Sequence, residues 1–84
     1  EHLPEPTPTQ VHALLQAHLS HMYDFYGESL GVRTARKHIG WYLDGRPGAA
    51  DWRPRILRAP DRATQQQLIT RYFQSLPQGE EIAA

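Results

Sequence analysis

The chain has 84 residues, enough for one small domain, and its nine basic and nine acidic side chains give a formal net charge of zero. It contains no cysteine, which excludes disulfides, zinc–thiolate sites and a thiol nucleophile. No apolar run approaches the roughly 20 residues that span a bilayer, and no signal peptide pattern is visible. We therefore expect a cytoplasmic protein that does not contact a membrane, and the initial Glu1 suggests a fragment of a longer chain.

The zero net charge conceals a strong asymmetry along the chain. Residues 1–28 contain four acidic side chains and no lysine or arginine. Residues 29–62 contain eight basic side chains, seven of them arginine, and three aspartates, which gives a charge of +5. Arginine presents a planar fork that matches phosphate oxygens. A basic middle third of this kind predicts an anionic partner.

The first helical signal follows a proline-rich opening, residues 1–8, which is typical of a linker or tail. Thr7, Pro8 and Gln10 have the spacing of a capping box with proline at the first helical position. A helix that starts there should end near Gly27. Its apolar arc contains Val11, Leu14, Leu15, His18, Leu19, Met22, Phe25 and Tyr26.

Two further helices are expected in the basic third. The first covers residues 29–44 and ends at Gly45. The next covers about residues 49–58 and contains Pro54, which a helix tolerates in its first turn. This helix should therefore begin at Asp51 as its N-cap or be distorted. The apolar arc of the helix over 29–44 contains Val32, Ala35, Ile39, Tyr42 and Leu43, and its opposite arc contains Arg33, Lys37, Gly40 and Trp41 with Arg36 at the margin.

A fourth helix is predicted over residues 62–76, with Asp61 as its N-cap. Its apolar positions are Leu68, Ile69, Tyr72, Phe73 and Leu76. Neither strand-type alternation nor an internal repeat is present, so the expected fold is all-α: a small four-helix bundle over residues 9–77, preceded by the linker and followed by a disordered tail at 78–84.

The histidines and aromatic residues have a structural interpretation. His18 and His21 have no companion carboxylate at a useful position for a metal site, so His18 is expected in the core. Ser20, His21 and Asp24 do not face one another on a helix, and we expect no catalytic residue in this chain. The remaining aromatic side chains of the first and fourth helices are expected to pack in the core: Tyr23, Phe25, Tyr26, Tyr72 and Phe73.

Trp41 leaves two interpretations open. It lies on the arc of Arg33 and Lys37, where an exposed indole provides a stacking surface or a cation–π partner. Alternatively, it packs against another helix or against a missing part of a longer protein. Together with the arginines that follow, the basic residues of this helix would form a continuous cationic surface suited to a nucleic-acid backbone.

Residues 24–59 resemble the C-terminal helical domain of bacterial tRNA-dihydrouridine synthases, in particular the B-type branch, and the resemblance extends over about residues 11–76. The shared pattern consists of Phe25, Tyr26 and Gly27, then Gly31, then Ala35 to His38, then Trp41 and Tyr42, and finally Pro47 and Gly48, followed by an arginine-rich helix. Pro54 and the glutamine run of the fourth helix have no match in that pattern.

The resemblance implies a division of labour within a larger enzyme. An N-terminal barrel in such enzymes binds FMN, uses NADPH as electron source and a cysteine as proton donor, and reduces a uridine of tRNA to dihydrouridine. The helical domain binds and orients the tRNA. This chain is therefore expected to bind no cofactor or metal itself, to have tRNA and the barrel of the same protein as partners, and to be a monomer.

The resemblance assigns backbone contacts to one set of residues, and charge and exposure add a second set. The first set is Arg33, Arg36, Lys37 and His38, and the second is Trp41, Arg46, Arg53, Arg55 and Arg58. His38 could also form an internal hydrogen bond. Two rival hypotheses are a helical module that docks an acidic protein partner and a structural bundle that covers a neighbouring catalytic domain.

Overall fold

The computed structural model describes residues 7–76, which form four helices: α1 (Pro8–Tyr26), α2 (Glu28–Leu43), α3 (Ala49–Leu57) and α4 (Arg62–Gln74). No strand occurs within 7–76, which confirms the all-α prediction. The tail at 78–84 and most of the proline-rich linker lie outside the described residues. None of the described helices is long and apolar enough to cross a bilayer.

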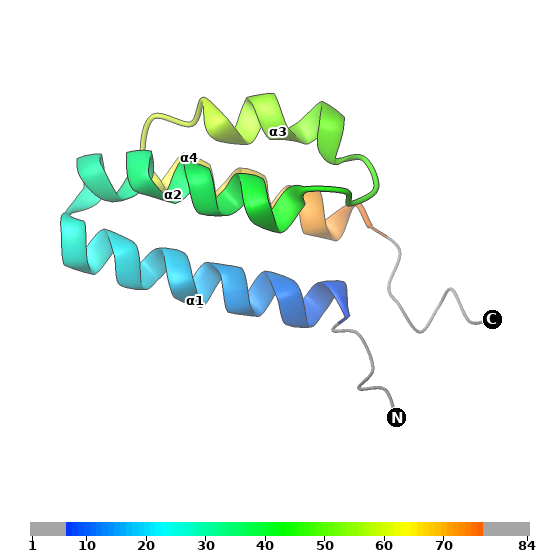
Figure 1. Ribbon diagram of the computed structural model, residues 1–84, viewed down its shortest axis with the longest axis horizontal. Coiled ribbons are helices and arrows are strands. Elements are labelled where there is room, and N and C mark those ends of the chain that lie inside the picture. Colours follow the sequence, from blue (N-terminus) through cyan, green and yellow to red (C-terminus); the bar gives the residue numbers. More distant parts are fainter. Residues whose placement is uncertain (1–6, 77–84) are drawn as a thin grey trace.

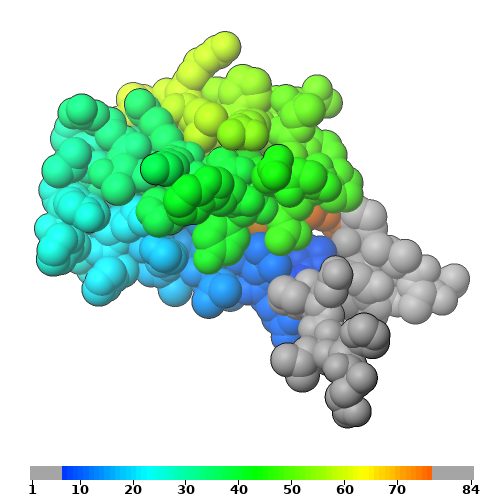
Figure 2. Space-filling view, viewed as in Figure 1, coloured from blue at the N-terminus to red at the C-terminus, as the bar shows by residue number. Residues whose placement is uncertain are grey.

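The helices are arranged with α2 and α4 in the middle of the molecule. Helix α1 packs against both from one side, and α3 packs against both from the other. Figure 1 shows this order, with α1 below, α3 above, and α2 in front of α4. In consequence, α2 has one free face between α1 and α3, which is the front of the molecule in Figure 2.

The start of α1 has the predicted capping box. Thr7 Oγ1 accepts from the Gln10 N–H at 3.1 Å, and the Thr7 N–H donates to Gln10 Oε1 at 2.9 Å. The helix ends at Gly27, whose φ of +83° lets α2 begin at the next residue. The turn between α1 and α2 is therefore tight, and the two helices run antiparallel.

The interior is built from aliphatic and aromatic side chains of all four helices. Val32, Ala35, Ile39 and Leu43 of α2 are buried as predicted, and Tyr42 is half-buried. On α4, Ile69, Tyr72 and Phe73 are buried, while Leu68 and Leu76 pack at the edge of the core. The fully buried larger side chains are Tyr72, Leu15, Leu19, Ile39, Leu43, Ile56, Ile69, Gln65 and Val32.

The predicted buried arc of α1 is partly wrong. Leu14, His18, Phe25 and Tyr26 are exposed, whereas Tyr23 is buried. The stripe of α1 that faces α2 and α4 is turned towards Tyr23 relative to the predicted arc, and it contains Val11, Leu15, Leu19, Met22 and Tyr23. The other apolar side chains of α1 point to solvent.

A polar link inside the core was not predicted. The Tyr23 hydroxyl donates to Gln65 Oε1, and Gln65 Nε2 donates to the Val32 carbonyl at 3.2 Å. Gln65 is fully buried, and both polar atoms of its side-chain amide have a hydrogen-bond partner. An unpaired polar atom at this position would destabilise the fold. The link joins α1, α4 and α2 at one end of the bundle.

Helix α3 begins at Ala49, after Gly48 at φ +73°, so Asp51 lies in the first turn and is not its N-cap. Pro54 lies in the second turn, beyond the position where we expected a proline to be tolerated. The helix continues through Pro54, which is exposed; the proline removes the hydrogen bond that an N–H at this position would make, and its ring crowds the carbonyl of the preceding turn.

Helix α4 begins as predicted and ends two residues earlier, at Gln74. Asp61 Oδ1 accepts from the Thr64 N–H at 2.8 Å, and this hydrogen bond lowers the pKa of the Asp61 carboxyl. Near the end of α4, the Tyr72 hydroxyl donates to the Pro47 carbonyl at 2.9 Å. This bond fixes the turn between α2 and α3 against α4, and therefore the position of α3 beside α2.

Candidate nucleic-acid interface

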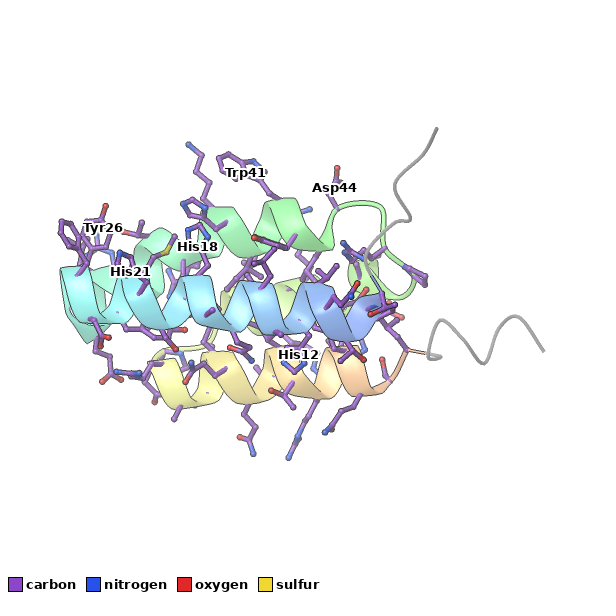
Figure 3. All side chains as sticks on the ribbon, turned by 90° about the horizontal axis from the view of Figure 1, so that it is seen from below. His12, His18, His21, Tyr26, Trp41 and Asp44 are labelled. Carbon is purple, nitrogen blue, oxygen red and sulfur yellow. The ribbon has the colours of Figure 1, made fainter. Side chains whose placement is uncertain are left out.

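The free face of α2 presents Arg33, Lys37 and Trp41, which are four residues apart and therefore lie in one row. All three are exposed, and 63% of Trp41 is accessible to solvent. Lys37 Nζ lies 5.4 Å from the centre of the Trp41 ring, within the range of a cation–π contact. Trp41 therefore does not pack against another of the described helices, and its indole points outward in Figure 3. This exposure is compatible both with a stacking surface and with a contact to another part of a longer protein.

Helix α3 adds a guanidinium to this row. Arg53 Nη2 lies 2.9 Å from the position that a Cβ on Gly40 would take. Gly40 is therefore the gap on α2 over which the Arg53 side chain extends. Gly40 follows Lys37 by about one helical turn, so the Arg53 guanidinium reaches the surface of α2 on the same side as Lys37.

Arg46 lies in the turn between α2 and α3 and extends the same surface. Its Nε donates to the Tyr42 carbonyl, which restrains the side chain at the end of α2. Arg46 and Arg53 line a hollow of about 310 Å³, and Arg46 and Trp41 line a second hollow of about 300 Å³; Asp44 lines both. We call the set Arg33, Lys37, Trp41, Arg46 and Arg53 the α2–α3 face.

Arg36 is not a free surface cation. It is half-buried, and its Nη2 donates to the Ala59 carbonyl at 3.4 Å. Its Nε is buried without a hydrogen-bond partner among the described residues. Arg36 thus joins α2 to the end of α3, as its position at the margin of the polar arc allows.

Arg55 and Arg58 stand apart from the α2–α3 face. The Arg55 guanidinium covers the Trp52 ring at 4.3 Å, and Trp52 contacts Tyr72 of α4 edge-on, with ring centres 6.2 Å apart. Positions 53 and 55 do not face the same way on a helix. Arg58 is exposed at the C-cap of α3, next to the residue that Arg36 binds. Arg55 is therefore held on the side of α3 that carries Trp52, and Arg58 lies at the end of α3 near Arg36.

His38 occupies the border between α2 and α1. Its ring lies 5.1 Å from that of His18 and meets the Trp41 ring edge-on at 5.2 Å. Partial burial lowers the pKa of His38, and His18 and Lys37 lower it further because both disfavour a second positive charge nearby. His38 is thus both a contact between helices and a neighbour of the α2–α3 face.

The sequence interpretation missed a second surface, which lies beside His38. A pocket of about 330 Å³ between α1 and α2 is lined by His18, His21, Met22, Phe25, Tyr26, Thr34 and His38. We call it the imidazole pocket. Of its α1 residues, His18, Met22, Phe25 and Tyr26 belong to the predicted apolar arc, so the sequence pattern predicts core packing for them and no surface pocket. Within 7–76, no group of three histidine, aspartate or glutamate side chains could hold a metal ion.

Comparison with known proteins assigns the chain to a family. The dihydrouridine synthase (Dus) family model matches residues 1–77. The chain belongs to the dihydrouridine synthase family, as its resemblance to that family predicted.

Individual relatives agree with this assignment. The chain is 41% identical to tRNA-dihydrouridine synthase B of Pseudomonas putida over 81 residues, which are 96% of the chain and 24% of the relative. It is 42% identical to tRNA-dihydrouridine synthase B of Xanthomonas campestris over 77 residues, 92% of the chain and 23% of the relative. A probable tRNA-dihydrouridine synthase of Rickettsia conorii is 33% identical over 82% of the chain and 21% of its own length.

The chain spans about a quarter of the length of the curated relatives it matches. No solved structure gives a significant match to it.

Proposed function

We propose that this chain is the tRNA-recognition part of a tRNA-dihydrouridine synthase and that it binds the RNA backbone through the α2–α3 face. The observation that carries the proposal is the placement of Arg53 across Gly40. It brings a guanidinium of α3 onto the surface of α2 at Gly40, one helical turn from Lys37. Cations from two helices then present a fixed arc to neighbouring phosphates, which a single solvated helix face would not do.

The role of such a face is to position the RNA. Arg33, Lys37, Arg46 and Arg53 would contact phosphate oxygens, and the Trp41 indole would stack on a base or sugar at the centre of the row. Phosphate contacts fix the register and orientation of an RNA but do not read its sequence. The module would therefore recognise the shape of a folded tRNA and direct one uridine towards the catalytic centre.

The reduction itself would take place outside this chain. The described residues offer exposed hollows and no glycine-rich loop that could hold a phosphate group, so they do not fit FMN or NADPH. We assign the FMN, the NADPH and the proton-donating cysteine to a catalytic barrel in the remaining part of the enzyme. The part played by the present chain is to hold the substrate.

The proposal is tested by titrating the chain with an unmodified tRNA transcript and following backbone amide shifts. We expect shifts at Arg33, Lys37, Trp41, Arg46 and Arg53 that weaken steeply between about 50 and 200 mM salt, because phosphate binding releases counterions. An acidic protein partner would be indicated if tRNA gave no shift on this face at low salt while a polyglutamate did. That result would overturn the proposal.

A further inference from the structure

The imidazole pocket between α1 and α2 exposes aromatic side chains that a small helical protein would normally bury. Phe25 is 74% exposed and Tyr26 is 44% exposed, and their rings meet edge-on with centres 4.9 Å apart. Figure 3 shows His18, His21 and Tyr26 along the edge of α1 next to α2. Large apolar side chains gathered on a surface are typical of a binding site.

The polar groups of the pocket restrict the class of ligand. Three imidazoles line it, those of His18, His21 and His38, and its lining contains no carboxylate. An imidazole can donate and accept hydrogen bonds, and it also offers a flat face for stacking. Phe25 and Tyr26 add two further aromatic faces. This combination suits a planar, polar heterocycle better than the aliphatic surface of a protein.

The pocket is continuous with the α2–α3 face. His38 contacts His18 on the pocket side and Trp41 on the other, at 5.1 and 5.2 Å between ring centres. Lys37 lies over Trp41. A phosphate held near Lys37 would thus belong to a nucleotide whose base can reach the pocket. Its volume of about 330 Å³ lies at the lower end of the range of small-ligand sites, which suits a single base.

We infer that the imidazole pocket binds one unstacked base of the RNA whose backbone the α2–α3 face holds. The inference rests on the proposed function. The base stacks on Phe25 or Tyr26, and its edge exchanges hydrogen bonds with His18, His21 or His38. This base is not the uridine that is reduced, because that uridine must reach the flavin outside the chain. The pocket therefore selects RNA that offers an unpaired base at a fixed distance from the bound phosphates.

The test compares two oligomers that share the same backbone. Single-stranded oligouridylate and an abasic ribose-phosphate oligomer of equal length are titrated into the chain, and aromatic and imidazole side-chain resonances are followed. We expect oligouridylate to shift resonances of His18, Phe25, Tyr26 and His38. The abasic oligomer should shift only the amides of the α2–α3 face.

A matched pair of variants separates stacking from general binding. Phe25→Ala removes an exposed ring, and the core should remain intact because Phe25 is not part of it. The variant should weaken oligouridylate binding about tenfold and leave the abasic oligomer unaffected, since one base–aromatic stack contributes roughly this factor. Gln67→Ala, at an exposed position of α4, should change neither affinity.

The outcomes separate this inference from the proposed function. If both oligomers bind equally and shift only the α2–α3 face, the base site is wrong and backbone recognition stands. If Phe25→Ala binds oligouridylate as tightly as the parent chain, the base site is again wrong. If neither oligomer nor a tRNA transcript gives any shift, both proposals fail together.

Discussion

The Arg53 guanidinium on α3 lies against Gly40 on α2, with Nη2 2.9 Å from the place where a Cβ would be. The contact joins two helices that the chain connects only through a short turn at residues 44–48. It places an α3 cation on the surface of α2, one helical turn from Lys37. A side chain on residue 40 should therefore affect binding without entering the hydrophobic core.

Gly40→Ala should separate binding from stability. The added methyl displaces only the flexible end of Arg53, while alanine favours the helix by up to about 1 kcal/mol over glycine. We expect an unfolding free energy that is unchanged or slightly raised, and a several-fold loss of tRNA affinity. Urea unfolding and a binding titration of the same variant check this. A large loss of stability would show that the Arg53 side chain cannot move away from the added methyl group.

Gly31→Ala should have the opposite effect on stability, although it is the same substitution on the same helix. A Cβ on Gly31 would meet the Tyr23 Cα at 3.0 Å and the Met22 carbonyl at 3.1 Å, and backbone atoms cannot move aside as a side-chain end can. We expect a loss of about 1–3 kcal/mol, because α1 and α2 must separate. Urea unfolding that matches the parent chain would contradict this close packing.

Alkaline pH should destabilise the fold through Tyr23. Burial raises the pKa of its hydroxyl to about 12, with Arg62 opposing and Glu28 adding to the shift. Because the folded pKa exceeds the unfolded value near 10, the contribution is complete below about pH 10 and is lost as the pH rises towards 12. Melting temperatures measured between about pH 10 and about pH 12 should show this loss of stability.

Tyr23→Phe tests the same hydrogen bond at neutral pH. It leaves Gln65 Oε1 without its donor and should cost about 1–3 kcal/mol. Its alkaline melting profile should be flatter than that of the parent chain. Tyr26→Phe, at an exposed tyrosine on the same helix, is the control and should change neither quantity. Equal alkaline profiles for Tyr23→Phe and the parent chain would rule out Tyr23 as the source.

Acid should destabilise the fold through His12. Its ring stacks on Phe73 with centres 4.9 Å apart, and burial lowers the pKa of the imidazole. The folded pKa lies below the unfolded value near 6.5, so stability is complete above that pH and falls as the pH drops below it. Melting temperatures at about pH 7.5 and below about pH 6 should show this decline. His12→Gln should reduce it, and His21→Gln, at an exposed α1 position, should not.

The local features of the fold could be predicted from the sequence, and the features that depend on several helices could not. Thr7 and Asp61 cap helices through bonds to residues three positions away, so their roles are visible in a short sequence window. Tyr23 and Gln65 meet across 42 positions, and no periodicity shows this contact. The assignment of Phe25 to the core failed because one helical period cannot show how many neighbours α1 has.

The same distinction applies to the candidate interface. Arg33, Lys37 and Trp41 follow from helical spacing alone. The separation of Arg53 from Arg55 depends on the side from which α3 meets α2, and the half-burial of Arg36 depends on the Ala59 carbonyl. Charge along the sequence therefore indicates a cationic region, and the packing of helices selects which cations share a face.

Binding of tRNA by the α2–α3 face can be tested with a single pair of charge-reversal variants. Lys37→Glu is compared with Arg71→Glu, which has the same charge change at an exposed position of α4. The dissociation constant for an unmodified tRNA transcript is measured for both variants at low salt. We predict at least a tenfold loss of affinity for Lys37→Glu and a much smaller change for Arg71→Glu. Equal effects of the two variants would show that tRNA does not bind through the α2–α3 face.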